Sequence, residues 1–167
     1  MAEQKQVKYD LDGYNVVTKA LMELLNQFPG MESGEQIEFS ELGEESGFAM
    51  YPINGAAIES ERTSVTGKVT EVCLYPFYII FRETGLNETR RIETKERLDN
   101  IGKWLEGKEI NIDDTSYKLS EYPTLTGNRK FLEFRRQTPA YLDNTFENQS
   151  EDWAIYISAR YQNEYKK

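Results

Sequence analysis

Apolar residues recur at every third or fourth position in two stretches of the chain, the spacing that places them on one face of a helix. The first stretch predicts a helix with Asp12 or Asn15 as its cap and Pro29-Gly30 as its end. The second predicts a helix over about 89–106, which Gly107 terminates. The expected apolar faces contain Val16, Val17, Ala20, Leu21, Leu24, Leu25 and Phe28 in the first helix, and Ile92, Leu98, Ile101 and Leu105 with Trp104 alongside in the second. The basic residues of the second helix are expected in solvent: Arg90, Arg91, Lys95 and Arg97.

The longest alternating pattern covers residues 56–83 and predicts a β-hairpin with a first arm at 57–60 and a loop near 62–67. The returning arm has apolar residues on both faces, which predicts burial on both sides for its second half. Pro76 has no N–H to donate, so we expect a bulge or a sheet edge there. Alternation also predicts strands at about 36–40, 47–52, 130–137 and 153–164.

This order of elements predicts an α+β fold. We expect an antiparallel or mixed sheet with two helices on one face and a long β-hairpin, because a parallel doubly wound sheet would need more helices between its strands. The length of 167 residues fits one domain over 1–167, with residues 1–12 flexible.

Charge is distributed unevenly along a chain whose net charge is -9. No Lys or Arg occurs between Lys19 and Arg62, whereas nine glutamates do. Such a segment is either a solvated acidic loop or a surface that repels DNA phosphates. The candidate acidic surface or channel lining consists of Glu35, Glu38, Glu41, Glu44 and Glu45.

The residue types that most enzymes and metal sites need are scarce. Histidine is absent and Cys73 is the single cysteine, which removes nucleophile–histidine pairs, structural zinc sites and intrachain disulfides. No apolar run is long enough to span a membrane, and no secretory signal is recognisable, so we expect a protein kept in a reducing cytosol. We therefore expect no enzymatic activity, no catalytic residues, no metal and no cofactor.

Three weak catalytic patterns remain. Residues 102–108 have the spacing of a phosphate-binding loop, but Glu109 stands where Ser or Thr must hold magnesium, and the segment ends a helix. Glu93-Thr94-Lys95 and Asp113-Asp114 are more typical of a solvated helix face and a turn than of a magnesium site. No spacing in the sequence excludes a pair of carboxylates that hydrolyses a glycoside, and no residue pattern supports one.

Basic and aromatic residues cluster in the segment 129–136. This pattern fits three kinds of strand. It fits a strand that binds single-stranded nucleic acid, an edge strand whose charges prevent pairing with another sheet, or a strand that contacts the acidic segment of a neighbouring copy. The acidic chain as a whole favours the edge strand over specific nucleic-acid binding. Tyrosine and arginine are enriched in protein interfaces. The candidate subunit interface consists of Arg135, Arg136, Tyr75, Tyr78 and Tyr156.

Five segments together resemble a family of small structural proteins from tailed phages and prophages, known as minor capsid or minor tail proteins, some of which are similar to siphophage tail terminators. They span most of the chain as a pattern of core positions: 24–30 (LLNQFPG), 75–81 (YPFYIIF), 98–105 (LDNIGKWL), 122–125 (YPTL) and 153–161 (WAIYISARY). The extended acidic region 32–61 departs from the family pattern.

The resemblance implies a non-enzymatic role in virion assembly and head–tail joining. It implies a homo-oligomeric ring, usually a hexamer, that caps the tail tube and contacts tail-tube or head-connector proteins. Such a protein is made in the host cytoplasm and ends at the head–tail junction of the virion. The alternative is an acidic, DNA-mimicking inhibitor that binds a nucleic-acid enzyme, and a small carboxylate-only hydrolase comes third.

Overall fold

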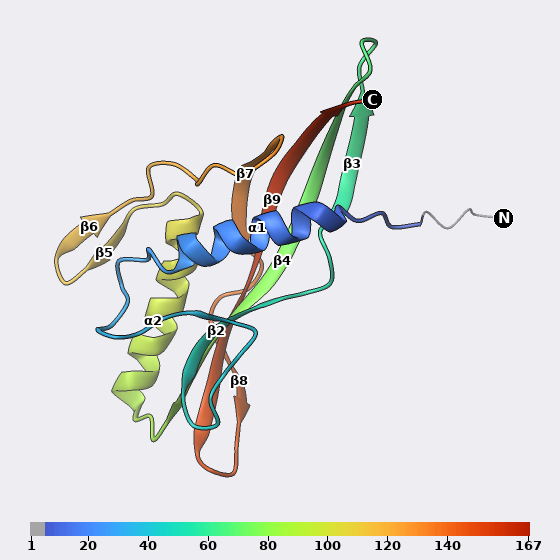
Figure 1. Ribbon diagram of the computed structural model, residues 1–167. Coiled ribbons are helices and arrows are strands. Elements are labelled where there is room, and N and C mark those ends of the chain that lie inside the picture. Colours follow the sequence, from blue (N-terminus) through green and yellow to red (C-terminus); the bar gives the residue numbers. More distant parts are fainter. Residues whose placement is uncertain (1–5) are drawn as a thin grey trace.

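The structure is a computed structural model that describes residues 6–167, and it confirms the expected α+β class. Two helices and a mainly antiparallel sheet make up the fold (Figure 1). In chain order the elements are α1 (Leu11–Leu25), β1 (Glu38–Phe39), β2 (Gly47–Pro52), β3 (Ala57–Thr63), β4 (Lys68–Thr84), α2 (Glu88–Leu105), β5 (Ile110–Ile112), β6 (Thr115–Tyr117), β7 (Arg129–Arg136), β8 (Tyr141–Thr145) and β9 (Ser150–Lys166).

Two long strands form the centre of the sheet. β4 and β9 each contain 17 residues and pair antiparallel along their whole length, from Lys68 opposite Lys166 to Thr84 opposite Ser150. At about 3.3 Å per residue this ladder is roughly 55 Å long. β2 and β3 flank β4, and β7 and β8 flank β9. β1 pairs with β2 in parallel, so the sheet is mixed, and the expected hairpin is the β3–β4 pair.

Pro76 lies in the middle of β4, yet it is at a local edge, as its missing N–H requires. On one side β4 pairs continuously with β9. On the other side β2 ends at Pro52, opposite Phe77, and β3 begins at Ala57, opposite Leu74. Pro76 faces the gap between these two strands, where its carbonyl accepts a hydrogen bond from the N–H of Ile53 at 2.9 Å.

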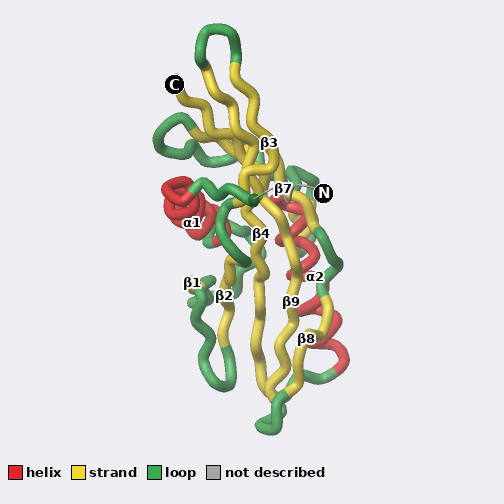
Figure 2. The backbone as a smooth tube through the Cα atoms, turned by 90° about the vertical axis from the view of Figure 1, so that its right-hand side faces the viewer, coloured by secondary structure: helices red, strands yellow, loops and turns green. Residues whose placement is uncertain are grey.

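Both helices pack on the same face of the sheet. The hydroxyls of Thr18 in α1 and Tyr75 in β4 lie 2.6 Å apart, and Gly102 of α2 lies against Ile155 of β9. Because side chains alternate along a strand, Tyr75 and Ile155 share this buried face. In Figure 2, β2, β4, β9 and β8 lie side by side with no helix in front of them. The expected burial of the second β4 face is therefore wrong, since Tyr78 and Ile80 are only half-buried.

Helix α1 begins earlier than its apolar pattern indicates. Its cap is Asp10, whose carboxylate accepts the N–H of Gly13 at 3.1 Å, so the expected caps Asp12 and Asn15 are wrong. The N–H of Asp10 donates to Ala56, and the carbonyl of Lys8 accepts from Ile58. These bonds fix residues 8–10 to the start of β3. Of the tail expected to be flexible, residues 1–5 lie outside the described residues.

Helix α2 has a different solvated face from the one expected. Ile92, assigned to the apolar stripe, is 54% exposed. Arg97, expected in solvent, is largely buried, and its guanidinium lies 4.7 Å from the ring centre of Phe81 and pairs with Glu35. Gly107 follows the helix with φ of +80°, so the expected terminator is confirmed.

Candidate functional site

The face of the sheet opposite the helices carries a patch of half-buried apolar and aromatic side chains. The register places alternate residues of β4 and β9 there, together with their neighbours from β2 and β8. No helix within residues 6–167 covers these side chains, although most of them are large and apolar or aromatic, as in a protein interior. We call this surface the open-face patch, and it consists of Tyr51, Leu74, Pro76, Tyr78, Ile80, Tyr141 and Tyr156.

Tyrosines form the centre of the open-face patch. The rings of Tyr78 and Tyr156 have centres 5.0 Å apart and planes tilted by 30°. Burial raises the pKa of Tyr141, and Asp143 and Tyr78 raise it further. Burial also raises the pKa of Tyr51. Tyr51 and Tyr141 are thus neutral at physiological pH. Each of the four tyrosines presents an apolar ring with a hydrogen-bonding tip, which suits a protein interface.

Tyr75 does not belong to the patch, although the sequence suggested it for the same interface. It is 1% exposed and lies beneath α1, where its ring packs 5.5 Å from that of Tyr14. Burial raises its pKa, while the hydrogen bond with Thr18 opposes that change. The cause is the alternation of the strand, which sends Tyr75 and Tyr78 to opposite faces. Tyr75 is a core residue.

Arg135 and Arg136 are separated in the same way. Arg135 is on the open face, where its side chain is 67% exposed and its nearest carboxylate oxygen belongs to Glu133 at 3.8 Å. Arg136 points to the helix side, where its Nε donates to Glu106 at 2.7 Å and its aliphatic stem covers Gly102. Arg135 is exposed to solvent, whereas Arg136 fixes α2 to the sheet.

A small hollow adjoins the open-face patch. It encloses about 240 Å³ between β4, β7 and β9, and its walls include Leu74, Pro76 and Tyr156. Arg160 lies at its rim, with one guanidinium nitrogen 3.0 Å from Glu59 and another 3.0 Å from Glu133. The hollow gives the open face a recess beside the aromatic side chains.

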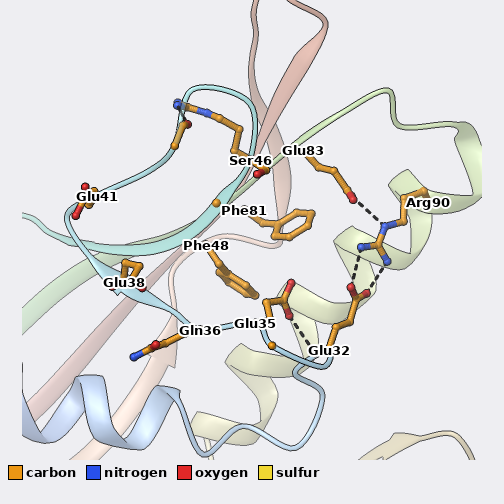
Figure 3. A pocket seen from close by; sticks show the side chains of 14 residues that line it. Glu32, Glu35, Gln36, Glu38, Glu41, Ser46, Phe48, Phe81, Glu83 and Arg90 are labelled. Carbon is orange, nitrogen blue, oxygen red and sulfur yellow. Dashed lines mark hydrogen bonds and ion pairs between the residues drawn. The ribbon is translucent and has the colours of Figure 1, made fainter.

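An acidic groove of about 620 Å³ lies on the helix side, between the segment 32–47 and the start of α2 (Figure 3). Phe48 and Phe81 form its floor, with their rings edge to face at 5.3 Å. Glutamates surround this floor. They are Glu32, Glu35, Glu38, Glu41 and Glu83.

Only part of this acidic charge is free. Arg90 pairs with Glu32 at 2.7 Å and with Glu83 at 3.0 Å, and Arg97 pairs with Glu35. The hydrogen bond from Arg90 lowers the pKa of Glu32, although burial opposes it. Glu35, expected on a free acidic surface, is therefore tied to α2.

The other four predicted glutamates form no ion pair within residues 6–167. Glu38 and Glu41 line the groove. Glu44 and Glu45 lie in the loop beside it, where only their backbone carbonyls are engaged, by Asn148 at 3.4 Å and Thr84 at 2.9 Å. We call this set the acidic loop, and it consists of Glu38, Glu41, Glu44 and Glu45.

The weak catalytic patterns fall on structural elements. Residues 102–105 end α2, so their N–H groups bond within the helix. Glu93 lies on the exposed side of α2, and Asp113 and Asp114 form the β5–β6 turn with positive φ values. No group of three His, Cys, Asp or Glu in residues 6–167 is arranged to hold a metal ion. Nor is any helix in this range both long and apolar enough to cross a membrane.

A comparison with protein-family models gives no match, and a comparison with curated proteins gives none either. Sequence reasoning missed Tyr51 and Arg160 as members of the open face. The sequence signal for the open face was the alternation in 72–80, where every residue on the second face of the strand is apolar or aromatic. Strand pairing then places residues of β2, β7 and β8 beside them.

Proposed function

We propose that the chain is a structural subunit that works by self-assembly, as the ring that terminates a phage tail tube and joins it to the head. The observation that carries this proposal is the open-face patch. A sheet buried by helices on one face and left aromatic on the other has a surface suited to a second protein.

The dimensions of the sheet support the same proposal. The β4–β9 ladder extends beyond α1 at the end where the β3–β4 turn and the end of β9 lie (Figure 1). A long, mostly uncovered sheet has room for contacts of about 1,000 Å² or more with a neighbour. The unpaired acidic loop adds a surface that DNA phosphates avoid, which suits a protein beside a DNA channel.

The inhibitor that mimics DNA is the weaker proposal. Such a protein needs free carboxylates spaced like phosphates over one face. Three of the glutamates around the acidic groove are instead neutralised by Arg90 and Arg97.

The test is complementation of a phage that lacks the gene. Deleting the gene is expected to leave filled heads and unjoined or irregular tails in electron micrographs. The wild-type gene and a Lys19→Glu control are expected to restore virions, because Lys19 is exposed on α1, away from the open face. Arg135→Glu, which makes the same charge change on the open face, is expected to fail while the protein still folds. Normal virions from the deletion strain would end the proposal.

A further inference from the structure

Basic side chains gather on one half of the open face although the chain is acidic overall. The half concerned is flanked by β3 and β7, and the register places six basic residues on it. Three acidic side chains reach the same area, namely Glu59, Glu133 and Glu164. We call this surface the basic stripe, and it consists of Arg62, Lys68, Lys130, Arg135, Arg160 and Lys166.

The basic stripe is only partly neutralised within the chain. Lys68 pairs with Glu164 at 3.1 Å, and Arg160 is shared between Glu59 and Glu133. Lys130, Arg62 and Lys166 are exposed and form no ion pair in the part of the chain that the structure describes. The stripe therefore presents positive charge that a partner can neutralise.

The same chain carries the complementary surface. The acidic loop has four carboxylates without ion pairs in residues 6–167, and it borders the groove on the helix side of the sheet (Figure 3). The acidic loop lies beside the end of β4 at Arg82 and Thr84, whereas the basic stripe is flanked by β3 and β7 toward the other end of β4. They cannot neutralise each other within a chain, but they can do so between two copies.

We infer that the basic stripe of one copy binds the acidic loop of the next copy, head to tail. The inference rests on the proposed self-assembly and names the surfaces that carry it. Because the two surfaces differ, the contact is heterologous, and a bound pair keeps one free loop on the first copy and one free stripe on the second. Such contacts continue until a ring closes. DNA is the less suitable occupant of the stripe, because the net charge of -9 repels it at long range.

Zero-length cross-linking tests the contact directly. An equal mixture of unlabelled and nitrogen-15-labelled full-length chain is treated with a carbodiimide, which joins lysine amines to carboxylates that touch. The expected mixed-isotope peptides link Lys68, Lys130 or Lys166 to Glu38, Glu41, Glu44 or Glu45. Interchain links that join open face to open face, or the absence of interchain links at any attainable concentration, would overturn the inference.

Charge reversal supplies the second arm. Lys130→Glu with Arg135→Glu, or Glu38→Lys with Glu41→Lys, is expected to weaken self-association about tenfold at low salt. Combining all four changes in one chain is expected to restore self-association. The matched control, Lys19→Glu with Lys118→Glu, alters two exposed lysines outside the stripe and is expected to leave association unchanged.

Two outcomes separate this inference from the proposed function. Failure of the four-change variant to regain association contradicts the pairing of stripe with loop, as does binding of duplex DNA that depends on Lys130 and Arg135. Head-to-tail association with normal virions from the deletion strain supports the contact and removes the phage role.

Discussion

At the scale of single residues, one buried cluster fixes the N-terminal helix to strands β7 and β9. The carboxylate of Asp10 accepts hydrogen bonds from Arg129 at 2.7 and 2.9 Å, from the Tyr161 hydroxyl at 2.9 Å and from Gly13. One side chain thus caps α1 and joins it to β7 and β9. This cluster could not be predicted from the sequence, because only the folded sheet brings the cap together with two partners more than 100 residues away.

Replacing Asp10 by Asn is expected to destabilise the protein by about 3 kcal/mol, because it leaves the Arg129 guanidinium without its buried partner. The free energy of unfolding in urea measures the effect. Asp12→Asn changes an exposed acid two residues away and is expected to alter stability by less than about 0.5 kcal/mol. Equal effects of the two changes would contradict the role assigned to Asp10.

The same carboxylate predicts a pH dependence. Burial raises the pKa of Asp10, but the hydrogen bonds from Arg129, Tyr161 and Gly13 together lower it below its usual value of 3.8. A carboxyl whose pKa is lowered by folding stabilises the protein above its unfolded pKa, and that stability is lost as the pH falls through the folded pKa. Wild-type stability is therefore expected to fall as the pH drops below 3.8. In Asp10→Asn this fall is expected to be shallower, as urea unfolding at a series of acidic pH values measures.

At the scale of elements, the hydrophobic pattern was sufficient for the long units and for some of the short ones, since strands were also expected where β1 and β2 lie. Both helices, the β3–β4 hairpin, β7 and β9 were predicted, because each buries a regular series of side chains. β5, β6 and β8 were missed, since β6 and most of β8 are exposed and their residues show no alternation. The burial of Arg97 could not be predicted either, because its partners Glu35 and Phe81 come from other elements.

The docking of α2 on the sheet depends on a glycine. A Cβ at Gly102 would lie 2.5 Å from Cδ of Arg136 and 3.1 Å from Cδ1 of Ile155. Alanine normally stabilises a helix by about 1 kcal/mol relative to glycine. Here Gly102→Ala is expected to destabilise by about 2 kcal/mol, because Arg136 must leave Glu106. Thermal and urea unfolding measure whether Gly102→Ala lowers the free energy of unfolding instead of raising it.

A double-mutant cycle distinguishes this crowding from a general effect on α2. In the background Arg136→Ala the clash with the arginine stem is absent. Gly102→Ala is then expected to cost much less than in the wild type. An unchanged cost would attribute the effect to Ile155 alone.

At the scale of the whole molecule, the two faces of the sheet have different tasks. The helix face builds the core, and no helix within residues 6–167 covers the open face. Sequence reasoning placed Tyr75 and Tyr78 in one interface because it lacked the position of the helices, which decides between the two faces.

The contrast between Tyr75 and Tyr78 is testable. Tyr75→Phe removes the hydroxyl that contacts Thr18, so it is expected to cost about 1 kcal/mol of stability and to leave self-association intact. Tyr78→Ser is expected to weaken self-association, with a smaller effect on unfolding than a core tyrosine would give. Sedimentation velocity and urea unfolding on both variants separate the two effects. Loss of association in Tyr75→Phe, with retention in Tyr78→Ser, would reverse the assignment of the faces.

The central place of β9 has a consequence for biosynthesis. Every other described strand leaves the ribosome before β9, yet β4, β7 and β8 all pair with it. Until β9 emerges, the nascent chain exposes one edge of β4, an apolar strand of 17 residues. The sheet therefore forms after its last strand is made, through pairings distant in sequence, which slows folding and leaves an aggregation-prone edge for chaperones to protect.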